Sequence, residues 1–272
     1  MLPTPSTSHV PFERVYEPAE DSFLLLDTLS SEAERTFLQN RFSLPCQHER
    51  NSREPRTPLH SPVVAEVGTG SGVVLAFVNA HAQTMFGRND ILTIGIDVNV
   101  YACKATAETV RIAAQEQTQG GKSYGCYLGN LLGDLTSSLR SGIVDVLIFN
   151  PPYVPTPELP RLPFPKSAPQ ISYMPSFEDD SHLLSLSYAG GTDGMEITNR
   201  LLDMLSVTLS PNGTAYILLS AQNKPNFVKE TIRGWDSGWL VETVGSSGKK
   251  AGWEKLQIIR IWRNKPQHET KP

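Results

Sequence analysis

Short apolar runs alternate with longer helix-like segments between residues 63 and 153, and this alternation restricts the possible folds more than any other feature. The apolar runs have the length and the Val and Ile content of buried strands. We expect strands at 63–68, 91–98, 123–130 and 144–150, and helices at 73–86 and 101–117. Strands that alternate with helices predict an α/β fold, in which a parallel sheet carries helices on both faces.

The pattern on either side of this core is less regular. A helix is expected over residues 19–38, and another helix that ends in a Pro-Asn-Gly turn, a strand and a helix are expected at 192–213, 214–222 and 225–235. Residues 240–263 predict two antiparallel strands around a Gly/Ser turn. We interpret the chain as a single domain at 15–263, with a flexible tail at 1–14, a loop at 41–62, an insert at about 155–187 and a polar tail at 264–272.

The composition excludes several classes of protein. The chain has 272 residues, of which 39% are hydrophobic, and its apolar runs are too short to span a membrane. The first 18 residues lack the basic and apolar regions of a signal peptide. The three cysteines form no CxxC pair, so we expect no metal site in this chain and a reducing location in the cytoplasm or nucleus. The net charge of −4 argues against nucleic-acid binding, while leaving room for a local basic patch.

A glycine-rich turn and an acid mark the ends of the first two core strands. Gly68, Gly70 and Gly72 lie in EVGTGSG, where a strand meets a helix, and Asp97 ends the next strand 25 residues after Gly72. Glycines there let a ligand approach the backbone, and an acid at this place can bind ribose hydroxyls. Each feature also has a simpler interpretation, a tight turn for the glycines and a helix cap for Asp97. Together they favour a cofactor that contains adenosine.

The fourth core strand ends at Asn150-Pro151-Pro152-Tyr153. Neither proline has an N–H group to donate to the sheet, so this turn costs the strand two hydrogen-bond donors. That cost suggests that the turn has a function. The Asn150 side-chain oxygen and the Pro151 carbonyl are two acceptors, which match the two hydrogens of a planar amide or amino group. The Tyr153 ring can lie against that group. An amide is a poor nucleophile, so this clamp needs a reactive donor such as a sulfonium methyl group. The alternative is a loop that only terminates the strand.

Ligands of open parallel sheets bind outside the carboxyl ends of the strands. We therefore expect the glycine turn, Asp97 and the Asn150–Tyr153 turn to meet at one crevice. With these motifs the chain resembles the S-adenosylmethionine-dependent methyltransferases that modify planar nitrogens. The segments YEPAEDSFLLLDTL (16–29) and AGGTDGMEITNRLL (189–202) narrow the resemblance to the HemK-like release-factor glutamine methyltransferases of eukaryotes and archaea, over about residues 15–153 and 188–262.

The resemblance implies a Rossmann-like methyltransferase fold, with a mostly parallel seven-stranded sheet and an antiparallel C-terminal strand. It implies that S-adenosylmethionine is the cofactor and S-adenosylhomocysteine its product. The implied target clamp is Asn150, Pro151, Pro152 and Tyr153. The implied cofactor-binding residues are Tyr16, Asp21, Ser22, Glu66, Gly68, Thr69, Gly70, Gly72, Asp97, Val98, Asn130, Leu131 and Asn150. Among these, Asp97 matches the ribose position, Asp21 and Ser22 the methionine part, and Asn130 and Leu131 the pair beside the adenine.

The chain departs from the family at three places. Asn130 stands where relatives often carry Asp, Ser22 stands where Thr is commoner, and the insert from about 159 to 182 has no counterpart in compact relatives. An Asn can still accept a hydrogen bond from an adenine amino group, and a Ser keeps the hydroxyl.

The family also implies a substrate and a partner. The expected reaction is N5-methylation of the glutamine in the GGQ loop of the class 1 translation termination factor. The expected partner is a small zinc-binding activator subunit, which forms a heterodimer with the chain. In this topology the strand near Tyr124–Leu128 is expected at a sheet edge, where an activator could add a strand; the alternative is an edge blunted by a loop. Rival functions are methylation of an adenine amino group in DNA or RNA, methylation of lysine, and a non-catalytic binding subunit.

Overall fold

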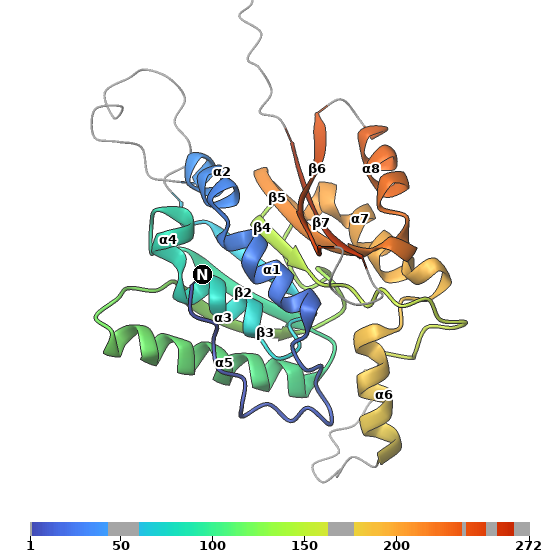
Figure 1. The fold of residues 1–272 in the computed structure, drawn as a ribbon, viewed down its shortest axis with the longest axis horizontal. Coiled ribbons are helices and arrows are strands. Elements are labelled where there is room, and N and C mark those ends of the chain that lie inside the picture. Colours follow the sequence, from blue (N-terminus) through green and yellow to red (C-terminus); the bar gives the residue numbers. More distant parts are fainter. Residues whose placement is uncertain (1, 43–59, 163–176, 236–237, 249–254, 264–272) are drawn as a thin grey trace, which may run out of the picture.

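The computed structural model describes residues 2–42, 60–162, 177–235, 238–248 and 255–263 (Figure 1). Within these residues seven strands form one sheet in the order β3-β2-β1-β4-β5-β7-β6. The first five are parallel, while β7 is antiparallel to both of its neighbours, as expected. The strands are β1 Val63–Val67, β2 Leu92–Asp97, β3 Cys126–Leu132, β4 Val144–Phe149, β5 Leu209–Ser220, β6 Trp239–Ser246 and β7 Leu256–Arg263.

Helices cover both faces of the sheet because the side chains of each strand alternate between them. In β4, Val146 and Ile148 pack with α1, α2, α3 and α4, while Leu147 and Phe149 pack with α7 and α8. The helices are α1 Glu20–Ser30, α2 Glu32–Phe42, α3 Val73–Ala80, α4 Ala82–Phe86, α5 Val100–Gln119, α6 Phe177–Tyr188, α7 Glu196–Thr208 and α8 Pro225–Arg233. All six residues of β4 are buried, so this strand is the centre of the fold.

Three expected elements have different boundaries in the structure. The helix expected over residues 19–38 is two helices, because Ser31 is extended (ψ 153°) and its hydroxyl accepts from the Glu34 N–H at the start of α2. The helix expected at 73–86 breaks at His81 between α3 and α4. The expected Pro-Asn-Gly turn lies within β5, which begins at Leu209, directly after α7.

Two segments expected to be irregular have defined contacts. Within residues 1–14, where we expected a flexible tail, Val10 packs together with Val15 against Ala102 and Ala105 of α5. The insert contains a helix, α6, which lies apart from the sheet (yellow in Figure 1). The rest of the insert at 163–176, most of the expected loop at 41–62, and the tail at 264–272 lie outside the described residues. None of the described helices has the length and apolarity to cross a membrane.

A buried ion pair joins α2 to the sheet. Arg260 of β7 donates through Nη1 to both carboxylate oxygens of Glu34 at 2.8 Å, and the Tyr216 hydroxyl donates to the same carboxylate at 2.7 Å. The side chains of Glu34 and Arg260 are 3% and 9% exposed. Burial raises the pKa of Tyr216 and the nearby carboxylate raises it further, so the hydroxyl stays a donor.

Removal of one partner of this pair leaves the other charge buried and uncompensated. We predict that Glu34→Ala lowers the free energy of unfolding by about 3–5 kcal/mol in a urea titration. Glu242→Ala is the matched control, because Glu242 contacts the same guanidinium at 3.0 Å with its side chain 61% exposed. It should cost about 0–1 kcal/mol. Equal costs for the two variants would contradict the assignment of the stabilising role to Glu34.

Candidate active site

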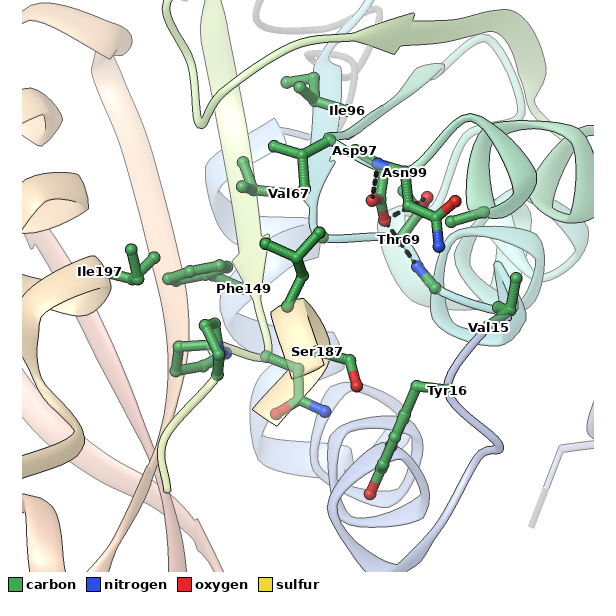
Figure 2. A pocket seen from close by; sticks show the side chains of 18 of the residues that line it. Val15, Tyr16, Val67, Thr69, Ile96, Asp97, Asn99, Phe149, Ser187 and Ile197 are labelled. Carbon is green, nitrogen blue, oxygen red and sulfur yellow. Dashed lines mark hydrogen bonds between the residues drawn. The ribbon is translucent and has the colours of Figure 1, made fainter. Parts of the chain in front are cut away.

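The carboxyl ends of β1, β2 and β4 open into one cavity, as the sequence predicts (Figure 2). The parallel register places Val67 beside both Ile96 and Phe149, so the residues that follow these strands lie together. The expected site residues that line the cavity are Tyr16, Asp21, Ser22, Glu66, Gly68, Thr69, Gly70, Asp97, Val98, Asn150, Pro151 and Pro152. Four others, Gly72, Asn130, Leu131 and Tyr153, do not line it.

The turn after β1 requires its glycines. Gly68, Gly70 and Gly72 have φ angles of +65°, +51° and +77°, which L side chains rarely adopt. A Cβ on Gly72 would lie 2.5 Å from the Thr106 Cα, so this residue lets α3 and α5 approach each other. Gly72 therefore supports the site by packing, while Gly68 and Gly70 form the cavity wall.

Asp97 fastens the glycine turn to the end of β2. Its carboxylate accepts from the Gly70 N–H at 3.0 Å and from the Asn99 N–H at 2.8 Å. Burial raises the pKa of Asp97, and these two hydrogen bonds act in the opposite direction. Asp97 is not the side chain that caps α5, because the Asn99 side chain accepts from Tyr101 N–H there. The Asp97 carboxylate thus binds the glycine turn and lines the cavity.

Glu66 is the second acid at the base of the cavity. It is 3% exposed, and its Oε2 accepts from the Leu75 N–H of α3 at 2.9 Å. Burial raises the pKa of Glu66 well above its ordinary value, and the hydrogen bond from Leu75 only partly offsets this.

The turn after β4 carries an unsatisfied acceptor. Asn150 Oδ1 is buried and has no hydrogen-bond partner within the described part of the chain. A buried polar atom without a partner costs about 1–3 kcal/mol of folding stability. Such an atom is unusual in a folded protein, and a ligand that donates to it would explain its place here. Pro151 and Pro152 line the same cavity. The Tyr153 hydroxyl lies behind them, 3.5 Å from Asp21 Oδ2.

Residues far along the chain hold this turn in place, and one of them, Asn223, has no signal in the sequence. The buried side chain of Asn223 donates from Nδ2 to the carbonyls of Tyr153 and Asp193, both at 3.0 Å. A Cβ on Gly190 would lie 2.4 Å from the Pro152 carbonyl oxygen, and one on Gly194 would lie 2.0 Å from that of Tyr153. The Gly-Gly-Thr-Asp-Gly segment therefore packs directly on the backbone of the turn.

The start of α1 and the segment before it contribute another wall of the cavity. Asp21 accepts from the Tyr16 hydroxyl at 3.0 Å and from the Ser22 N–H at 2.6 Å. Both Asp21 and Ser22 are buried, although they lie in the first turn of α1. The segment before α1 thus reaches the cavity, as the resemblance implied.

The position expected for Asn130 and Leu131 needs a correction. Both residues lie within β3, and the Asn130 amide donates to the Cys103 carbonyl of α5. The strand continues to Leu132, two residues beyond its expected end, so the cavity is lined by Gly133, Asp134 and Leu135 instead. A signal was present in the sequence, since Asp134 is an acid two residues after the end of β3, much as Asp97 is the last residue of β2.

The insert supplies one wall of the cavity. Leu183, Leu186 and Ser187 of α6 line the cavity, together with Leu159 and Leu162 from the chain before it. Figure 2 shows Ser187 in this pocket with Tyr16 and Phe149.

Comparisons with known proteins agree with this geometry, although no family model matches the chain. It is 32% identical to the eRF1 methyltransferase catalytic subunit mtq2 of Schizosaccharomyces pombe, over 97% of the chain and 96% of that protein. It is 30% identical to methyltransferase HEMK2 of Homo sapiens, over 96% and 97%. It is also 29% identical to a release factor glutamine methyltransferase of Moorella thermoacetica, over 57% and 45%.

The chain belongs to the HemK-like family of release-factor glutamine methyltransferases. It is therefore a methyltransferase that uses S-adenosylmethionine, and the cavity fits this cofactor. Acidic acceptors at the ends of β1 and β2 suit hydroxyl groups, and the unsatisfied Asn150 oxygen suits the group that receives the methyl. In the part of the chain that the structure describes, no group of His, Cys, Asp and Glu side chains could hold a metal ion.

The raised pKa of Glu66 predicts a pH dependence of stability in this methyltransferase. The folded state holds a proton on Glu66 at pH values where the unfolded chain, with a pKa near 4.5, has lost it. The contribution of Glu66 to stability should therefore fall as pH rises above the unfolded-chain value of 4.5. Glu66→Gln keeps an acceptor for Leu75 and removes the titration. We predict that urea unfolding shows a variant that gains stability relative to wild type as pH rises; parallel pH profiles would contradict this.

Proposed function

We propose that this chain is the catalytic subunit that transfers a methyl group from S-adenosylmethionine to the side-chain nitrogen of the glutamine in the GGQ loop of the class 1 translation termination factor. The unsatisfied Asn150 Oδ1 in the cavity is the observation that carries the proposal. The name of the Schizosaccharomyces pombe relative, an eRF1 methyltransferase catalytic subunit, supports the substrate.

Each wall of the cavity has a part in cofactor binding under this proposal. Asp97 accepts hydrogen bonds from the ribose hydroxyls, and the glycine turn gives the ligand access to the backbone. Asp134 and Leu135 take the adenine-side place that we first expected for Asn130 and Leu131. Asp21 and Ser22 of α1 lie at the methionine end.

The target clamp works by orientation and electrostatics. The cofactor supplies an electrophilic methyl group. Asn150 Oδ1 and the Pro151 carbonyl accept the two hydrogens of the glutamine amide and direct its nitrogen toward the methyl group. Both acceptors also stabilise the positive charge that develops on the nitrogen as it takes the methyl group, so no base has to remove a proton beforehand; S-adenosylhomocysteine would be the leaving group, and the nitrogen would then release one proton to solvent. Asn223 keeps the clamp rigid through the Tyr153 carbonyl.

The polar residues around the cavity favour a protein over a nucleic acid as substrate. Asp21, Asp97 and Asp134 line the described cavity beside the protonated Glu66, and the cation Arg14 is engaged by Asp180. A nucleic-acid enzyme needs cations for the phosphates beside a captured base. Lysine is the weaker candidate because a tetrahedral ammonium has three donors, and two planar acceptors match it poorly.

The free edge of β3 supports the proposed activator subunit. β3 is an outer strand of the sheet, and Tyr124, Leu128 and Leu132 are 40%, 53% and 50% exposed there. An edge strand with apolar side chains is a template for strand addition by a partner. We propose that the small zinc-binding subunit pairs with β3 and covers these side chains.

A methyl-transfer assay with labelled S-adenosylmethionine tests the substrate and the partner together. The chain, with and without the zinc-binding subunit, is offered termination factor that carries either GGQ or a Gln→Ala change in that motif. Label that appears only with the subunit and only on GGQ supports the proposal. Label on an adenine-containing oligonucleotide instead of the factor would assign the clamp to a different substrate.

Asn150 is expected to act in transfer more than in cofactor binding. We predict that Asn150→Ala lowers kcat by at least about 100-fold, because the amide loses its main acceptor. Cofactor affinity, measured by calorimetry, should change by no more than about threefold, since ribose and adenine contacts lie elsewhere. A variant that keeps full transfer activity would disprove the clamp.

The β3 edge makes a separate prediction about assembly. Leu128→Glu and Leu132→Glu should each weaken copurification with the zinc-binding subunit by at least about tenfold, because a charge would be buried without a partner. Val207→Glu on α7 is the control, since Val207 is 59% exposed on another element. The proposed interface is wrong if Val207→Glu disrupts the complex and the two β3 variants do not.

A further inference from the structure

The insert helix α6 forms a wall of the active site, and both of its ends are held. At its carboxyl end, the Val154 N–H donates to the Tyr188 carbonyl at 2.9 Å and the Gly190 N–H donates to the Val154 carbonyl at 2.8 Å. The carboxyl end of α6 is therefore hydrogen-bonded to Val154, the residue directly after the clamp turn. In the middle of α6, His182 Nε2 lies 2.8 Å from the Arg161 carbonyl, which joins the helix to the chain at 159–162.

A side chain from the other side of the cavity reaches the amino end of α6. Arg14 Nε donates to Asp180 Oδ1 at 2.7 Å, across 166 positions of the sequence. The two side chains are 26% and 18% exposed, so solvent screens this charge-assisted bond only in part. Arg14 itself lines the cavity, and its guanidinium lies 4.8 Å from the centre of the Tyr101 ring.

The backbone of Arg14 continues this connection to the acid at the end of β2. The Asn99 side chain donates from Nδ2 to the Arg14 carbonyl at 2.8 Å, and the Asn99 N–H donates to Asp97 Oδ1 at 2.8 Å. Asp97, Asn99, Arg14 and Asp180 thus form a continuous chain of hydrogen bonds. It runs from the floor of the cofactor site to the wall that α6 builds with Leu183 and Leu186.

We propose that Arg14 is a positioning residue, which holds α6 over the cofactor through Asp180 and so slows cofactor release. The wall that it holds is apolar where Leu183 and Leu186 face the cavity. When α6 is in place, these side chains exclude water from the bound cofactor and narrow the entrance beside Asn150. When the ion pair is absent, the hydrogen bonds that still join α6 to other segments, among the described residues, are those at its carboxyl end and the contact with Arg161, and the mouth of the cavity widens. This inference depends on the cofactor site and not on the identity of the methyl acceptor.

Charge reversal tests the role of the pair. We expect Arg14→Glu and Asp180→Arg each to raise the dissociation rate of S-adenosylhomocysteine by about tenfold, because each places like charges side by side. The double variant restores an opposite-charge pair and should return the rate to within about twofold of wild type. Dissociation is measured by displacement of the labelled compound from the full chain, with the melting temperature recorded for each variant.

A second ion pair provides the matched control. Arg111 and Glu108 form an exposed pair within one helix, α5, so Arg111→Glu should leave the dissociation rate unchanged. Single variants at Arg14 and Asp180 that release the product at the wild-type rate would overturn the proposal. Failure of the double variant to recover, while the melting temperature is normal, would overturn it as well. Neither result would bear on whether the acceptor is GGQ, because no acceptor is present in this measurement.

Discussion

The register between three parallel strands is the constraint on which the active site depends. Because Val67 pairs with both Ile96 and Phe149, the next residues along β1, β2 and β4 lie at one edge of the sheet. A slip of one residue in β4 would turn Asn150 to the other face and place Phe149 in the wrong helical layer. The large apolar side chains of β4, buried on both faces, make such a slip costly. The packing of the core therefore sets the geometry of the clamp.

The polar groups of the site follow a common principle. Three acids at the cavity, Asp21, Glu66 and Asp97, are buried but meet backbone donors, as Asp97 meets the Gly70 and Asn99 N–H groups. Asn150 Oδ1 is different, because no described group satisfies it. A fold that satisfies the surrounding acceptors and leaves this one open is prepared for a donor from outside. A glutamine amide supplies such a donor, and this preorganisation lowers the cost of orienting a weak nucleophile.

The sequence predicted the features that depend on strand ends. Gly68, Asp97 and Asn150 were recognised because each follows an apolar run, and parallel topology then brings them together. Asn130 and Leu131 do not line the cavity because β3 ends two residues later than expected, and its half-exposed residues give only a weak strand pattern. Helix α6 was missed because it follows a proline-rich stretch. The Asn223–Tyr153 and Arg14–Asp180 contacts join residues 70 and 166 positions apart, which no local pattern reveals.

The most direct test of this account compares three methyl acceptors with the same enzyme. Termination factor with GGQ, with the glutamine replaced by lysine, and an adenine-containing oligonucleotide would each be incubated with the chain, the zinc-binding subunit and S-adenosylmethionine. Mass spectrometry would then locate the methyl group. The account predicts methylation of the GGQ side-chain amide at a rate far above that of the other two acceptors. Faster methylation of the lysine variant or of the adenine would contradict the central claim that the clamp selects a planar amide.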